Sequence, residues 1–255
     1  MPQELTPTER LAAEHLIIGI EVKPPPPKGM DWMIDRAFTL AKMALELGIP
    51  CVKVEALARA HPNIVDELRK LGLKVFLDLK LSGTKDTLAI DAILLKRSMP
   101  DLLSFMLKDL DPAAIESFHT ELPDTKLLGV AILTNLNEKK FRQRNGCSIE
   151  EEAIRRGAVA REAKMHGLIS APGEAGALRR KFAHELPLYA PAIRPEGVVL
   201  RIDDQDPERA MTPTQAVKAG VKYLIVQRPI TEAENPRDAA IKIIQEIAAV
   251  AYPKS

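Results

Sequence analysis

Two opposite charges, Asp78 and Lys80, stand at the end of an apolar segment that begins at Val75. Residues two apart in a strand point to the same face, so this carboxylate and this ammonium are expected to leave the strand together. Holding both charges close to an apolar core is costly unless they pair. The pair can serve as a structural ion pair or as an electrostatic centre for catalysis, and the local sequence leaves both possibilities open.

A further lysine, Lys53, lies within the apolar segment 50–55. A lysine in such a segment must either reach a carboxylate or extend its ammonium group to water. In parallel α/β folds, ligands bind at the carboxyl ends of the strands. Lys53, Asp78 and Lys80 are therefore candidates for a buried charge cluster at a ligand site.

The composition narrows the class of protein. The chain has 255 residues, of which 46% are hydrophobic, and its formal net charge is +1. This balance gives no reason to expect nucleic acid or a membrane surface as a partner. Two distant cysteines, five histidines without metal-ligand spacing and an N-terminus unlike a signal peptide predict a cytoplasmic protein with no disulfide framework and no metal site. No apolar run is long enough to span a bilayer.

Apolar strands alternate with amphipathic helices along the chain. This order predicts an α/β fold, a (β/α)8 TIM barrel formed by residues 15–255, with an N-terminal helical extension at 1–14 where Thr6 and Glu9 form a capping-box pattern. A doubly wound open sheet is the competing architecture. We expect residues 135–145 to be a polar connection and 195–211 a long loop. The expected strands are 16–22, 50–55, 75–81, 102–107, 126–133, 167–172, 188–194 and 223–226.

In such a barrel, the ends of the strands bring distant charges to one face. Arg194 and Arg228 end the seventh and eighth predicted strands, where barrels often bind phosphate. The pattern therefore predicts a phosphorylated small molecule as the ligand, with the lysine and aspartate cluster at its other end. The residues expected on this face are Glu21, Lys53, Asp78, Lys80, Thr134, Arg194 and Arg228.

Segments from Ile17 to Ile247 resemble the orotidine 5′-monophosphate decarboxylase family, in the family's order. Asp78-Leu79-Lys80 is similar to the start of its Asp-x-Lys-x-x-Asp motif, and Val52-Lys53-Val54 to its preceding lysine segment. Pro191-Ala192-Ile193-Arg194-Pro195 resembles its Pro-Gly-Ile-Arg-Pro segment. Further similar segments are 129–134, 167–172, 204–205, 211–213 and 228–231.

The resemblance implies a cofactor-free lyase. Lys80 would stabilise and protonate the carbanion left by CO2, Asp78 would face the substrate carboxylate, and Lys53 would complete the charge array. It also implies a homodimer, in which Thr87 belongs to a segment that reaches the partner's site. The implied substrate-binding residues are Glu21, Thr87, Thr134, Arg194, Gln205, Gln227 and Arg228.

Several residues depart from the family's pattern. Its second motif aspartate falls on Gly83, its first-strand aspartate is Glu21, and the glycine before the phosphate arginine is Gln227. Without a carboxylate at position 83, Lys53 and Lys80 are expected to share only Asp78, so the cluster would carry one extra positive charge. This predicts weak or absent decarboxylation that Gly83→Asp would improve, unless Asp86 replaces the missing carboxylate.

The alternatives therefore span three classes. The first is the decarboxylase itself. The second is a Mg²⁺-dependent sugar-phosphate aldolase or decarboxylase of the same superfamily. The third is a nucleotide- or phosphate-binding protein without catalysis. An assay with orotidine monophosphate, with and without EDTA, separates them.

Overall fold

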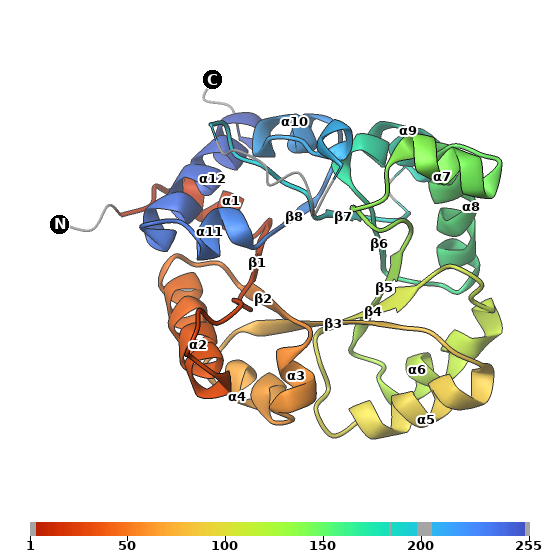
Figure 1. The fold of residues 1–255 in the computed structure, drawn as a ribbon, viewed down its shortest axis with the longest axis horizontal. Coiled ribbons are helices and arrows are strands. Elements are labelled where there is room, and N and C mark those ends of the chain that lie inside the picture. Colours follow the sequence, from red (N-terminus) through yellow and green to blue (C-terminus); the bar gives the residue numbers. More distant parts are fainter. Residues whose placement is uncertain (1–3, 184, 198–205, 253–255) are drawn as a thin grey trace.

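Eight parallel strands close into a barrel in chain order, in a computed structural model that describes residues 4–183, 185–197 and 206–252 (Figure 1). Each strand pairs with its neighbour in sequence, and β8 pairs with β1. The predicted (β/α)8 barrel is therefore confirmed and the open sheet is excluded. The strands are β1 Leu16–Gly19, β2 Cys51–Val54, β3 Lys74–Leu81, β4 Leu102–Met106, β5 Lys126–Val130, β6 Gly167–Ile169, β7 Leu188–Ala190 and β8 Tyr223–Val226.

Helices surround the barrel and cover the outer face of the strands (Figure 1). Side-chain caps fix several of their starts: the predicted capping box of Thr6 and Glu9 is present, and Thr84 caps the helix that follows β3. The α-helices are α1 Pro7–Ala13, α2 Met30–Glu46, α3 Leu57–Ala60, α4 Ile64–Lys70, α5 Lys85–Leu95, α6 Glu116–Glu121, α7 Glu138–Asn145, α8 Ile149–Glu162, α9 Ala175–Phe182, α10 Pro213–Lys218, α11 Arg228–Thr231 and α12 Pro236–Ala251. The 3₁₀ turns are η1 Pro112–Ile115, η2 Pro172–Glu174 and η3 Pro207–Arg209.

Two apolar clusters fill the fold. The larger cluster lies between the strands and the surrounding helices. The smaller one contains one or two residues from each strand, and their side chains lie together on the inner face of the closed sheet, so this cluster fills the inside of the barrel. Lys53 and Asp78 have the same parity as its members Cys51 and Phe76, so they also point inward, one step nearer to the carboxyl ends of the strands.

The structure differs from the sequence prediction at several places. The strands β1, β5 and β6 end earlier than predicted, at Gly19, Val130 and Ile169. Residues 138–145 form α7 rather than a polar connection, because Asn137 caps the first turn, Gly146 ends the helix in the left-handed conformation and Phe141 buries its ring. The seventh strand ends at Ala190, not at Arg194; two prolines, Pro191 and Pro195, interrupt the predicted continuation, and Ala192 has a φ of 63°.

Among the described residues, no helix is both long and apolar enough to cross a membrane.

Candidate active site

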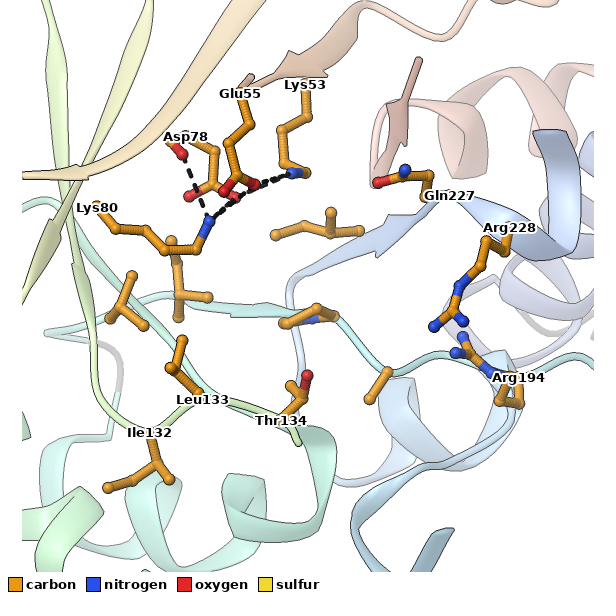
Figure 2. A pocket seen from close by; sticks show the side chains of 15 residues that line it. Lys53, Glu55, Asp78, Lys80, Ile132, Leu133, Thr134, Arg194, Gln227 and Arg228 are labelled. Carbon is orange, nitrogen blue, oxygen red and sulfur yellow. Dashed lines mark hydrogen bonds and ion pairs between the residues drawn. The ribbon is translucent and has the colours of Figure 1, made fainter. Parts of the chain in front are cut away.

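A cavity of about 220 Å³ opens at the carboxyl ends of the strands (Figure 2). Its floor is apolar, because Val130, Ile169 and Ile225 belong to the cluster inside the barrel. Charged side chains stand on opposite sides above this floor: Lys53, Glu55, Asp78 and Lys80 on one side, Arg194 and Arg228 on the other. The cavity thus has an apolar middle between two charged ends.

Lys53, Asp78 and Lys80 meet in one cluster, as the sequence predicted. One carboxylate oxygen of Asp78, Oδ2, lies 2.9 Å from the Nζ of Lys53 and 3.0 Å from the Nζ of Lys80. Neighbouring strands β2 and β3 bring these groups together, since Lys53 pairs with Phe76 in the sheet register. A single carboxylate therefore bridges two ammonium groups near the barrel core.

Glu55 supplies a further carboxylate that the sequence analysis did not identify. Its Oε2 lies 2.9 Å from the Nζ of Lys80 and 3.4 Å from the Nζ of Lys53. The expectation that both lysines share only Asp78, and that the cluster carries an extra positive charge, is therefore wrong. The signal was present in the sequence: Glu55 follows Lys53 by two residues, as Lys80 follows Asp78.

Ser104 of β4 holds the cluster from the neighbouring strand. Its hydroxyl donates to the Oδ1 of Asp78 at 2.7 Å and accepts the backbone N–H of Lys80 at 2.9 Å. The pairing of β3 with β4 shifts register between Leu77 and Leu81, and Lys80 has a φ of 52°. This bulge replaces a regular ladder hydrogen bond by one to Ser104, and bulges commonly redirect side chains at sites. Ser104 was also missed as a site residue.

The cluster keeps its buried groups charged. Burial has the largest effect on the pKa of the Asp78 carboxyl and raises it, but Lys53, Lys80 and the hydrogen bond from Ser104 together outweigh it, so this pKa lies below its ordinary value. Burial likewise lowers the pKa of Lys53, and Asp78, Glu55 and Glu21 reverse that effect, so the pKa of Lys53 is raised. Both groups are therefore ionised at neutral pH.

The opposite end of the cavity is cationic. The guanidinium groups of Arg194 and Arg228 face each other across this end (Figure 2). Arg194 follows β7 and its backbone N–H donates to the carbonyl of Met211, while Arg228 is the first residue of α11. Thr134 and Gln227 line the cavity as well. Two planar guanidinium groups on one side of a cavity are suited to a phosphate or carboxylate group.

Two other predicted substrate-binding residues, Glu21 and Thr87, lie away from the cavity. Glu21 does not line the cavity: its Oε1 accepts the backbone N–H groups of Glu55, at 2.9 Å, and of Leu57. Thr87 is exposed on α5 and its hydroxyl contacts that of Thr84 at 3.1 Å. Gln205 lies outside the described residues.

Gly83 and Asp86 also lie away from the cavity of their own chain. Both are exposed, Gly83 just before α5 and Asp86 in its first turn. A Cβ atom at position 83 would lie 3.2 Å from the Cβ and Cγ2 of Thr87. Within one chain, the carboxylate that joins Asp78 in the cluster is that of Glu55, not Asp86.

Comparison with known proteins identifies the family of the chain and several similar enzymes. Residues 28–243 match the family model described as "Orotidine 5′-phosphate decarboxylase / HUMPS family". An orotidine 5′-phosphate decarboxylase of Gloeothece citriformis is 30% identical over 222 residues, which cover 85% of this chain and 94% of the relative. One of Moorella thermoacetica is 30% identical over 249 residues, covering 94% of each chain.

Solved structures agree on the fold. A crystal structure of orotidine 5′-phosphate decarboxylase from Lactobacillus acidophilus superimposes with a TM-score of 0.70 at 22% identity, and covers 92% of this chain and 99% of its own. The corresponding enzyme from Pyrococcus horikoshii gives a TM-score of 0.69 at 23% identity, with coverage of 91% and 98%.

Proposed function

This chain belongs to the orotidine 5′-phosphate decarboxylase / HUMPS family, and we propose that it is a cofactor-free decarboxylase that converts orotidine 5′-monophosphate (OMP) to uridine 5′-monophosphate (UMP) and CO2. The observation that carries the proposal is the division of the cavity. A lysine and carboxylate cluster stands at one end and two guanidinium groups at the other, with an apolar floor between them. A nucleotide with a carboxylate on its ring and a phosphate on its ribose has the matching order of groups.

The phosphate would bind between Arg194 and Arg228. Charge-assisted hydrogen bonds from guanidinium to phosphate are among the strongest that proteins form, and they fix orientation as well as affinity. The resemblance to the family implies a further phosphate contact from Gln205, which lies outside the described residues. The pyrimidine would lie over the apolar floor near Thr134 and Gln227. The phosphate does not itself react, but its binding energy would position the ring for the reaction.

At the other end, the Nζ of Lys80 would face the ring carbon that bears the carboxylate. The bond from this carbon to the carboxylate breaks, its electron pair stays on the carbon, and CO2 leaves. The ammonium of Lys80 stabilises the carbanion and donates one proton to it, and the resulting amine takes a proton from water. The balance is OMP plus one proton giving UMP plus CO2.

The cluster would contribute to the rate because it is organised before substrate binds. Lys80 contacts Asp78 and Glu55 already in the free protein, at 3.0 and 2.9 Å. Charges fixed in advance need not reorganise as negative charge moves from the carboxylate to the ring, and such preorganisation is usually the largest catalytic effect. Asp78 would also face the substrate carboxylate, and Lys53 would hold Asp78 ionised.

We also propose that the protein acts as a homodimer through the surface of α5. Three large apolar side chains of this helix, Ile90, Ile93 and Leu94, are 58–61% exposed. Apolar residues gathered on one helix are typical of a surface covered by another protein. Thr87 lies on the same helix, so a partner seated there would approach the end of the helix nearest the barrel mouth.

One assay tests the function directly. The purified protein is mixed with OMP, and release of CO2 and formation of UMP are followed with and without EDTA. The proposal predicts turnover that EDTA does not change. Activity that is lost with EDTA and restored by Mg²⁺, with sugar phosphates as better substrates, would favour the aldolase or decarboxylase of sugar phosphates instead. Binding of UMP without any turnover of OMP would favour a non-catalytic nucleotide-binding protein.

A further inference from the structure

We propose that Glu55 is a positioning residue of the catalytic cluster: its carboxylate balances the second lysine and holds the ammonium of Lys80 for the reacting carbon. The inference rests on the proposed function. It goes beyond that function because it assigns a role to Glu55, which lies outside the motif Asp78-Leu79-Lys80.

The four charges form a closed ring. The Nζ of Lys53 lies 2.9 Å from Asp78 and 3.4 Å from Glu55, and the Nζ of Lys80 lies 3.0 Å from Asp78 and 2.9 Å from Glu55. Each ammonium thus touches both carboxylates, and the two positive charges are matched by two negative ones (Figure 2). Without Glu55, two ammonium groups beside an apolar floor would share one carboxylate, and the uncompensated charge would be costly there.

Two consecutive hydrogen bonds, both through Glu21, hold the backbone of Glu55 in place. Its N–H donates to the Oε1 of Glu21 at 2.9 Å, and the side-chain amide of Gln227 donates to the carbonyl of Glu21 at 2.7 Å. Gly19 makes room for this amide, since a Cβ atom there would lie 2.7 Å from the Oε1 of Gln227. Glu21 and Gln227, two residues that depart from the family's pattern, therefore hold the backbone of Glu55 in place.

The carboxylates of Asp78 and Glu55 differ in their exposure to solvent and to the cavity. The side chain of Asp78 is 10% exposed and hydrogen-bonded by Ser104, whereas that of Glu55 is 35% exposed and lines the cavity. Glu55 is thus the carboxylate nearer to solvent. Its negative charge would restrain Lys80 from one side while the substrate carboxylate approaches from the cavity. Departure of CO2 would relieve the repulsion between these two anions, so the interaction favours the transition state over the bound substrate.

The test uses two variants of Glu55 that separate the effect of its charge from the effect of its size. Glu55→Gln keeps the size of the side chain and removes the charge, and Glu55→Asp keeps the charge on a shorter side chain. We expect Glu55→Gln to lower kcat for OMP about 10²–10³-fold, the usual cost of removing one preorganised group. Glu55→Asp should retain at least about tenfold more activity than Glu55→Gln. Affinity for UMP should change little in either variant, because the arginines bind the phosphate at the other end.

A pH profile separates this role from a merely structural one. The carboxylate of Glu55 is one of the groups that raise the pKa of Lys53. Removing it lowers the lysine pKa, so the alkaline limb of kcat/KM in Glu55→Gln should move to lower pH. Glu46→Gln is the matched control: it removes a carboxylate that pairs with Arg237 at 2.8 Å on the surface, and it should leave kcat and the profile unchanged.

The two proposals fail in different ways. A wild-type protein that neither binds UMP nor decarboxylates OMP overturns the proposed function, and this inference with it. An active wild type whose Glu55→Gln variant is folded, binds UMP and keeps kcat within about threefold overturns the role of Glu55 alone.

Discussion

At the scale of single residues, Asp78 joins the parts of the site. Its Oδ2 contacts both lysines and its Oδ1 accepts the hydroxyl of Ser104. A buried carboxylate with three such partners stays ionised, which is the state that a charge array requires. The residues around it have separable roles, so single substitutions can test the two ends of the cavity independently.

The phosphate end is tested by Arg228→Ala. This change should weaken binding of UMP by about 1.5–3 kcal/mol, the loss expected for hydrogen bonds to a charged group. Binding of uridine, which has no phosphate, should hardly respond, and calorimetry with both ligands gives the comparison. Equal losses for UMP and uridine would place the phosphate elsewhere.

Gly83→Asp gives the second prediction at this scale. The gain in activity expected from the sequence depended on an excess positive charge that Glu55 in fact balances. Gly83 is also exposed and absent from the cavity of its own chain, and a Cβ atom there would crowd Thr87. We therefore expect kcat/KM of Gly83→Asp for OMP to stay within about threefold of the wild-type value. An increase of tenfold or more would show that the array still lacks a carboxylate.

At the scale of elements, the bulge between β3 and β4 decides where Lys80 points. The register shift leaves the backbone N–H of Lys80 without a regular ladder partner, and Ser104, which is fully buried, accepts it. The same hydroxyl donates to Asp78, so one side chain joins the geometry of the bulge to the charge of the cluster.

Ser104→Ala tests this connection. It removes a partner from one buried N–H and one buried carboxylate oxygen, so the free energy of unfolding should fall by about 1–3 kcal/mol at pH 7. The pKa of Asp78 is depressed in the folded state, so its contribution to stability is present above its unfolded pKa and is lost as pH falls through the folded one. Because the Ser104 hydrogen bond adds to that depression, the difference between variant and wild type should shrink below about pH 4.

Urea unfolding at several pH values measures these differences. Ser98→Ala is the control: Ser98 is also buried, but its hydroxyl only donates to the carbonyl of Leu95 at 3.1 Å. Its effect should not depend on acid pH. A loss of stability in Ser104→Ala that is the same at pH 7 and pH 3 would contradict a link to the charge of Asp78.

At the scale of the whole molecule, the closed barrel places the start of α5 beside the barrel mouth. The helix follows β3, whose carboxyl end bears Asp78 and Lys80. Ile90, Ile93 and Leu94 lie further along this helix, so a partner that covers the whole helix, as proposed above, would reach the barrel mouth at its first turn.

The double variant Ile90→Lys/Ile93→Glu tests the dimer. Charged side chains in an apolar interface are costly because they lose water without finding partners. We expect the wild type to behave as a dimer by light scattering at micromolar concentration, and the variant as a folded monomer. Replacing Leu45 by Glu is the control, since this residue is 44% exposed on α2, another helix. A monomeric wild type would overturn the assignment of α5 as an interface.

The sequence by itself determined the order of strands and helices and with it the barrel, because apolar period and capping residues are local signals. It also identified Lys53, Asp78 and Lys80 together, since strands adjacent in sequence are adjacent in a parallel barrel. The sequence analysis missed one helix, α7, because it has too few apolar residues for a periodic signal. It also placed the end of β7 too late, because the prolines around Arg194 end this strand early.

Only the tertiary structure decided the charge balance of the site. Whether the carboxylate of Glu55 turns towards Lys80 or to water depends on distances across β2 and β3, on the bulge that sets Lys80, and on the hydrogen bonds from Gln227 through Glu21. These contacts join residues up to 206 positions apart. Side-chain direction at a strand end is set by such neighbours and not by the local period, and for this reason the sequence showed the missing aspartate at Gly83 but not the glutamate that balances the lysines.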